Sequence, residues 1–135
     1  MTQEEKELLL KDLCGRLLYQ PNLQIYYEDI AGSGVFDEEL YEIDVDGQYC
    51  NDGRRLEDIK PYLRPMSSMT KEEKKKLSNI RPYFIDKNDN IIGVQCNSFI
   101  QNSECQDWLN SHHFDYRGLI PMGLALEAPE NMYKD

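Results

Sequence analysis

Residues 112–129 (HHFDYRGLIPMGLALEAP) hold the densest group of side chains in the chain that could do chemistry: two imidazoles, a carboxylate, a phenol and an arginine. One of the histidines with Asp115 could form an acid–base pair, in which the carboxylate orients the imidazole. We name His113 and Asp115 as catalytic candidates for a small hydrolase. The sequence identifies no nucleophile for them, and histidines with a structural or capping role are the alternative.

Metal binding by the two adjacent histidines is disfavoured by their spacing. Neighbouring residues face opposite sides of a strand and diverge by about 100° on a helix, so both imidazoles cannot easily reach one ion. The four cysteines are widely spaced and include no Cys-x-x-Cys pair. We therefore predict no metal and no cofactor, and we expect the cysteines to be reduced thiols that pack as small apolar side chains.

Three arginines stand beside a proline or a glycine, which holds the backbone near them in a defined geometry. A guanidinium group binds phosphate or carboxylate through paired hydrogen bonds, and a nearby tyrosine could stack on a ligand ring. Pairing of the arginines with the surplus of Asp and Glu is the alternative. The predicted ligand-binding residues are Arg64, Arg81, Arg117, Tyr62 and Tyr116.

The charge balance restricts the partners. The chain has 15 basic and 25 acidic residues, and its formal net charge is -10. A field of this sign repels polyanions at long range, so we predict no nucleic acid and no membrane surface as partner. The N-terminal residues lack the features of a secretion signal, and no window reaches the roughly 18 apolar residues that span a bilayer. We expect a soluble, cytoplasmic protein.

Helices are predicted at three places. Thr2 and Glu5 form a capping box ahead of apolar residues at helical spacing, although Gly15 weakens the end of that helix. Thr70 and Glu73 form a second capping box, which opens a short charged helix to about residue 77. Ser103 could cap a brief third helix.

Strands are predicted from alternation with a period of two. Residues 23–28 alternate, residues 32–34 (GSG) interrupt, and residues 41–45 alternate again before an Asp-Gly turn that returns through residues 48–50. Residues 56–63 suggest a short irregular or helical piece broken by prolines, and residues 81–85 and 91–96 a second hairpin. The sum is one α+β domain over residues 1–135, with a small antiparallel sheet and two or three helices.

Two segments resemble the hallmark stretches of a family of small proteins encoded by gut anaerobes and commonly by their phages and prophages. They are residues 58–76 (DIKPYLRPMSSMTKEEKKK), the first hallmark stretch, and residues 107–133 (DWLNSHHFDYRGLIPMGLALEAPENMY), the second. With residues 2–17 (TQEEKELLLKDLCGRL), the resemblance covers about half of the chain. The family has no established activity, so it implies no catalytic residue. It implies a phage-type cytoplasmic accessory protein.

Three functions are compatible with these observations. We predict a non-enzymatic protein-interaction module that binds a host protein. A mimic of DNA suits the sequence less well, because the acidic residues are dispersed and interrupted by lysines. The alternative is a small pocket protein that binds or sequesters a nucleotide-like anionic ligand, and the second alternative is a small hydrolase. The sequence leaves the oligomeric state open.

Overall fold

The fold of the computed structural model is α+β, as the sequence predicted. The structure describes residues 1–80, 83–85, 91–94 and 99–133, and this part holds three α-helices, a four-stranded sheet and two short two-stranded sheets. The elements are α1 (Gln3–Arg16), η1 (Leu17–Tyr19), β1 (Asn22–Asp29), β2 (Gly32–Glu39), β3 (Tyr49–Cys50), β4 (Arg54–Arg55), η2 (Leu56–Asp58), β5 (Ile59–Leu63), η3 (Met66–Ser68), α2 (Lys71–Ile80), β6 (Tyr83–Ile85), β7 (Ile91–Val94), α3 (Phe99–Ser111) and β8 (Leu126–Glu127).

Helix α1 begins at the predicted capping box. The amide of Glu5 donates to Thr2 Oγ1 (3.1 Å), and the amide of Thr2 donates to Glu5 Oε1 (3.0 Å). These bonds satisfy two of the backbone donors that the start of a helix leaves unpaired. Near the end of α1, a Cβ atom on Gly15 would lie 3.3 Å from Asn110 Nδ2 in α3. The glycine therefore allows α1 and α3 to approach closely.

The main sheet has the strand order β2-β1-β5-β8. β1 pairs antiparallel with β2 and with β5, whereas β5 pairs parallel with β8, so the sheet is mixed. Leu23 and Ile25 of β1 and Ile59 of β5 are fully buried and share one hydrophobic cluster with Leu13 of α1. Each such side chain stabilises the fold by about 1.5–3 kcal/mol, so α1 is held on the sheet mainly by apolar burial.

The strand predicted at residues 41–45 is wrong. Only an isolated bridge forms there, between Ile43 and Cys50, beside the predicted turn. The side chain of Asn51 takes the place of a partner strand: its Oδ1 accepts from the amides of Tyr41 (2.8 Å) and Glu42 (3.2 Å), and its Nδ2 donates to the Glu39 carbonyl (2.6 Å). The side-chain amide of an asparagine has both an acceptor and donors, so it can satisfy the backbone groups that a neighbouring strand would otherwise satisfy.

The second strand of the chain is instead β2, which includes the glycines predicted to interrupt. β2 pairs with β1 over eight residues, from Asn22↔Glu39 to Asp29↔Gly32. The glycines suit this hairpin for local reasons. Gly32 has a φ of 141°, which other residues rarely adopt, and a Cβ on Gly34 would lie 3.0 Å from Tyr27 Oη.

The prediction for residues 56–63 is correct only in its first turn. η2 is a short 3₁₀ helix, but β5 then runs as a strand through Pro61. Proline has no N–H for a sheet ladder and normally occupies an edge strand. Here Pro61 lies opposite Leu23 of β1, and β8 pairs only with the next two residues, Tyr62 and Leu63. β1 pairs with residues 59–61 of β5, whereas β8 pairs only with residues 62 and 63. β5 therefore tolerates the proline, because β8 does not pair with it.

A second layer contains α2, α3 and the β6–β7 hairpin. The predicted capping box starts α2: the amide of Thr70 donates to Glu73 Oε1 (2.9 Å), and the amide of Glu73 donates to Thr70 Oγ1 (3.2 Å). The β6–β7 hairpin is confirmed, with its turn outside the described residues, and α3 begins four residues before Ser103. Leu77 of α2 and Leu109 of α3 meet in a second hydrophobic cluster that includes Phe114.

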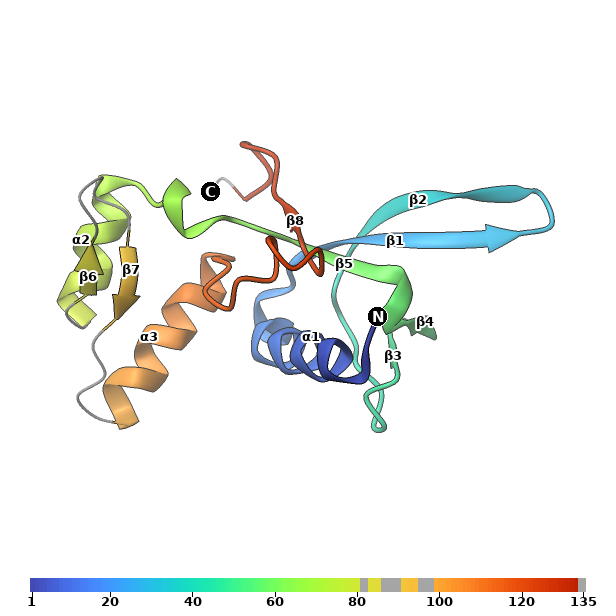
Figure 1. Ribbon diagram of the computed structural model, residues 1–135, viewed down its shortest axis with the longest axis horizontal. Helices are drawn as coiled ribbons and strands as arrows, with labels where there is room; N and C mark the ends of the chain where they lie inside the picture. Colours follow the sequence, from blue (N-terminus) through green and yellow to red (C-terminus); the bar gives the residue numbers. More distant parts are fainter. Residues whose placement is uncertain (81–82, 86–90, 95–98, 134–135) are drawn as a thin grey trace.

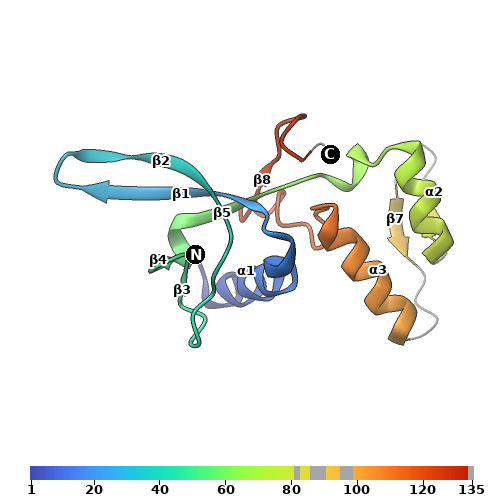
Figure 2. The ribbon, with the colours of Figure 1, turned by 180° about the vertical axis from the view of Figure 1, so that it is seen from behind.

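The molecule is elongated. The β1–β2 hairpin extends at one end, and α2 with the β6–β7 hairpin lies at the other, in both the front view (Figure 1) and the view from behind (Figure 2). Within the described residues, Cys14, Cys50 and Cys105 carry thiols rather than disulfides. No helix in the described part of the chain has the length and apolar character needed to cross a membrane.

Candidate functional site

The two hallmark stretches lie side by side. β8, in the second stretch, pairs with β5, in the first, at Tyr62↔Leu126 and Leu63↔Glu127. One residue further, the amide of Arg64 donates to the His113 carbonyl (2.7 Å), and the amide of Asp115 donates to the Arg64 carbonyl (2.8 Å). The sequence had left open whether these segments meet, and the backbone joins them directly.

A groove of about 690 Å³ lies between these two stretches, and every residue that lines it belongs to one of them. Its first side comes from η3 and the start of α2, and its second side comes from His112 and the chain after β8. The lining residues are Arg64, Pro65, Ser68, Thr70, Glu72, Glu73, Lys76, His112, Glu127, Ala128, Pro129, Glu130 and Tyr133.

Arg64 lies in this groove with its guanidinium already paired. Its Nη1 and Nη2 donate to the two carboxylate oxygens of Glu73 (2.7 Å each), and its Cζ lies 4.2 Å from the centre of the Phe114 ring. Burial opposes ionisation of Glu73, but hydrogen bonds from Arg64 and Thr70 outweigh it, so the pKa of Glu73 falls to about 2. An anionic ligand would have to displace a carboxylate to reach this arginine.

His112 faces a second hollow of about 500 Å³, which shares Arg64, Glu73, His112 and Tyr133 with the groove. His112 Nδ1 lies 2.9 Å from the Trp108 carbonyl oxygen, and the two rings stack with centroids 4.2 Å apart. Because a carbonyl only accepts, this contact favours the tautomer with a proton on Nδ1. Nε2 is then the basic nitrogen of this imidazole.

The predicted acid–base residues have structural contacts. Asp115 is buried, and its two oxygens accept from the amides of Leu119 (2.8 Å) and Ile120 (2.9 Å), which closes the turn after Arg117. The ring of His113 stacks on Tyr133, with centroids 3.8 Å apart. In this arrangement the carboxylate holds backbone, and the imidazole packs against a phenol.

Tyr116 and Arg117 belong to a buried charge cluster at the junction of α1 and α3. Arg117 Nη1 donates to Asp12 Oδ1 (2.8 Å) and to Tyr116 Oη (2.7 Å), and Tyr116 Oη donates to Asn110 Oδ1 (2.9 Å). Arg16 also binds Asp12, through Nε (2.7 Å) and Nη2 (3.1 Å), and Asp12 and Arg16 are both fully buried. Arg117 thus pairs with an acidic residue, as the alternative interpretation of the arginines expected.

Tyr62 lies apart from that cluster, on the outer face of the main sheet. Its Oη donates to Asp37 (2.9 Å) and accepts from Gln24 (3.4 Å), so it ties β5 to β1 and β2. Burial and the nearby Asp37 raise the pKa of Tyr62. The predicted ligand-binding residues therefore divide among three places: Arg64 in the groove, Tyr116 with Arg117 in the buried cluster, and Tyr62 on the sheet. Arg81 lies outside the described residues.

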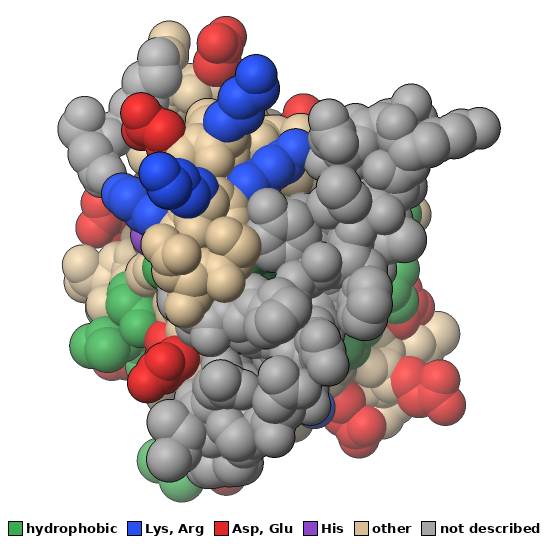
Figure 3. Space-filling model, turned by 90° about the vertical axis from the view of Figure 1, so that its left-hand side faces the viewer, with side chains coloured by type: hydrophobic (Ala, Val, Ile, Leu, Met, Phe, Trp, Pro, Cys, Tyr) green, Lys and Arg blue, Asp and Glu red, His purple; other side chains and the backbone are tan. Residues whose placement is uncertain are grey.

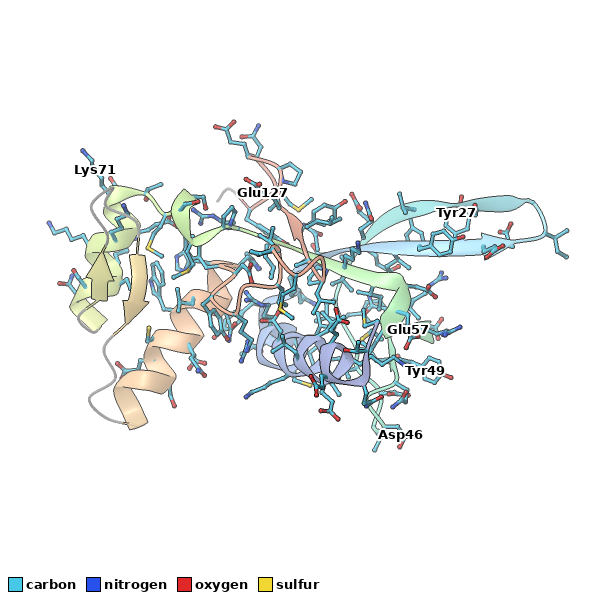
Figure 4. All side chains as sticks on the ribbon, in the orientation of Figure 1. Tyr27, Asp46, Tyr49, Glu57, Lys71 and Glu127 are labelled. Carbon is cyan, nitrogen blue, oxygen red and sulfur yellow. The ribbon has the colours of Figure 1, made fainter. Side chains whose placement is uncertain are left out.

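The feature that the sequence interpretation missed is the outer part of the β1–β2 hairpin, residues 26–36, which we call the arm. β1 pairs with β5 only from Leu23 to Ile25, so the arm extends beyond the rest of the sheet (Figure 1). Both faces of the arm meet solvent. Its exposed apolar side chains, of which Tyr27 is labelled in Figure 4, are Tyr26 (42% exposed), Tyr27 (38%), Ile30 (109%) and Val35 (55%).

The arm also lies in the most acidic part of the chain. Between Arg16 and Arg54 there is no basic residue, whereas the same segment holds nine acidic ones. The interpretation that lysines interrupt the acidic residues is therefore wrong for this segment, and a running charge count would have found it. The nine residues are Glu28, Asp29, Asp37, Glu38, Glu39, Glu42, Asp44, Asp46 and Asp52.

Comparisons with family models, with curated proteins and with solved structures found no match to this chain. Among the described side chains, no group of three or more His, Cys, Asp or Glu residues is placed to hold a metal ion. The geometry of the described residues offers two candidate sites, the arm and the groove.

Proposed function

We propose that the protein is a non-enzymatic interaction module that binds a partner protein through the arm. The observation that supports this most strongly is a two-stranded ribbon whose two faces are both exposed. A hairpin without a third strand or a covering helix is only marginally stable in water. A partner that covers the arm would supply the missing layer.

The outer edge of β2 adds a second argument. In the described part of the sheet β2 is a terminal strand, so its backbone groups on that side are available to another chain. Natural edge strands are usually protected by charged side chains, proline or a bulge. β2 contains no proline and pairs with β1 without a register shift, and its charged residues, 37–39, lie at its base and outside the arm. Such an edge suits addition of a strand from a partner, with Val35 contributing side-chain contacts.

Charge defines the chemistry of that partner. The arm carries Glu28 and Asp29 near its tip and no basic residue, so it attracts a surface with lysines or arginines. Following the family resemblance, we assign the partner to the host of a phage-type accessory protein and the interaction to the cytoplasm. The exposed tyrosines fit this role, because tyrosine is enriched in protein interfaces.

The test is capture from a host lysate, followed by affinity measurement with the purified partner. Val35→Lys places a charge on the arm, and Val45→Lys places the same charge on the turn between residues 44 and 47, where Val45 is 103% exposed. We expect Val35→Lys to weaken binding at least roughly tenfold and Val45→Lys to leave it unchanged. Equal affinities for the two variants would contradict the proposal.

The second candidate is a pocket for a small anionic ligand in the groove. Its supporting observation is that two adjoining hollows share Arg64, Glu73, His112 and Tyr133. The pairing of Arg64 with Glu73 argues against it. Native mass spectrometry of the protein recovered from the lysate separates the two functions. A retained small-molecule mass would favour the groove, and a retained protein whose binding depends on Val35 would favour the arm.

A further inference from the structure

The end of the molecule opposite the arm carries a basic surface on α2. Lys71, Lys75 and Lys76 are exposed, and none of them forms an ion pair within the described part of the chain. Figure 3, which looks onto this end, shows Lys and Arg side chains gathered over one region of the surface. Of the two acidic residues between these lysines, Glu73 is neutralised by Arg64, which leaves Glu72.

The arm presents the opposite charge. Glu28 and Asp29 are exposed next to Ile30 at the tip, and they too form no ion pair with described residues. Arg54 contacts the base of the arm, where its Cζ is 5.0 Å from the centre of the Phe36 ring. The tip therefore has an uncompensated negative charge.

These two surfaces cannot meet within one copy of the chain. Lys71 and Tyr27 lie near opposite ends of the longest axis (Figure 4), and the rear view places α2 and the β1–β2 hairpin at opposite ends as well (Figure 2). A second copy that lies antiparallel to the first brings the arm of each against α2 of the other. Both contacts form in the same association, and the assembly closes with two-fold symmetry.

We infer that the protein forms such a two-fold pair, in which each arm occupies the lysine surface of the partner copy. The inference rests on the proposed function, because it uses the arm as the binding element and names a second copy as one partner of the required chemistry. It also implies competition. A host protein that takes the arm must displace α2 of the other copy, so pairing would limit binding at high protein concentration.

The net charge of -10 per copy opposes this association at long range. Salt reduces this long-range repulsion, because the Debye length is about 8 Å at physiological ionic strength. Opposite charges in direct contact are screened much less. Two arm-to-helix contacts form for each pair, and the tip also buries Ile30, which is fully exposed in the single copy. The local contacts therefore have the advantage at moderate salt, and about 1 M salt separates the copies.

The experiment exchanges the charges of the two surfaces. The arm variant combines Glu28→Lys, Asp29→Asn and Ile30→Lys, which changes the formal charge of these positions from -2 to +2. Asparagine at position 29 keeps the side-chain oxygen that accepts from the Ala31 amide (2.9 Å). The helix variant combines Lys71→Glu and Lys75→Glu, from +2 to -2. Molar mass is measured by light scattering over a wide range of protein concentration.

The wild-type protein should be a dimer at physiological ionic strength, about 0.15 M, and a monomer at about 1 M salt. The arm variant and the helix variant should each be monomeric, and their equimolar mixture should form dimers. One chain that carries both sets of substitutions should dimerise again, because its surfaces are again opposite in sign. The control variant, Val45→Lys with Asp46→Lys, changes a different exposed turn from -1 to +2 and should dimerise like the wild type.

Several outcomes would overturn the inference: a wild-type chain that stays monomeric at every salt and protein concentration, assemblies that keep growing instead of closing as dimers, or an arm variant that still dimerises alone. A monomeric wild type that still captures a host protein through Val35 would leave the proposed function standing. Charge-dependent dimers combined with capture that ignores Val35→Lys would remove the proposed function and retain the self-pairing.

Discussion

At the scale of single residues, three arginines, Arg16, Arg64 and Arg117, pair with carboxylates inside the fold. Arg16 and Arg117 both bind the fully buried Asp12, and Arg64 binds Glu73 through both carboxylate oxygens. Removing one partner of a buried ion pair leaves an uncompensated charge, which is more costly than the pair is favourable. The acidic residues at the tip of the arm and the exposed lysines of α2, by contrast, form no ion pair with described residues.

The Glu73–Arg64 pair should make stability depend on pH. The pKa of Glu73 is about 2 in the folded protein and 4.5 for the free group, so the folded state binds this proton less readily than the unfolded state. Its stabilising contribution is complete above about pH 4.5 and is lost as the pH falls towards 2. We expect Glu73→Gln to lower the free energy of unfolding at pH 7 and to match the wild type near pH 2.

Urea unfolding at a series of pH values measures this difference. Glutamine keeps an oxygen that can accept from the Thr70 amide, so the variant tests the charge rather than the helix cap. Glu72→Gln, one residue earlier and exposed, is the matched control and should differ little from the wild type at any pH. A gap between Glu73→Gln and the wild type that is constant from pH 7 to pH 2 would exclude the assigned role.

At the scale of elements, the sequence predicted those whose signals are local. The capping boxes of α1 and α2 use residues three apart, and both helices begin where these boxes place them. Residues 41–45 alternate like a strand but form only the bridge from Ile43 to Cys50, because the side chain of Asn51 takes the amides of Tyr41 and Glu42. β5 runs through Pro61 because β1 and β8 overlap it at different residues. Whether a segment becomes a strand depends here on residues distant in the sequence. The spacing of apolar residues within the segment carries no information about them.

The sequence also predicted the candidate sites only in part. Residues 58–76 and 107–133, which stand out in the sequence, do line one groove, because β8 pairs in parallel with β5. The partner of Arg117 could not be assigned from the sequence, since Asp12 lies 105 residues before it in the chain. The arm was missed because the glycines of β2 were interpreted as a break, whereas the charge of that segment was readable from the sequence alone.

Asn51 provides a test of how one side chain replaces a strand. It is buried, has a φ of 45°, and makes hydrogen bonds to the backbone of residues 39, 41 and 42. Asn51→Ala leaves these groups without partners, and we expect the free energy of unfolding to fall by about 2 kcal/mol or more. Urea unfolding measures the change, with the exposed Asn131→Ala as the control. A loss no larger than that of the control would show that water replaces the amide at no cost.

At the scale of the whole molecule, the arm and α2 should respond together to salt. A lone ribbon opens readily, so its amides should exchange quickly when copies are separate, whereas Leu23 and Ile25, which lie between β2 and β5, should remain protected.

In the antiparallel pair, each arm is covered by the other copy. Hydrogen exchange read by mass spectrometry should therefore show residues 26–36 slowing on transfer from about 1 M salt to physiological ionic strength, about 0.15 M, in step with the fraction of dimer. Residues 71–76, on the surface that the arm covers, should slow over the same range, and the turn around Val45 should not. If the arm exchanged equally fast in both conditions while light scattering reported dimers, the copies would associate through another face, and the arm would remain open for a different protein.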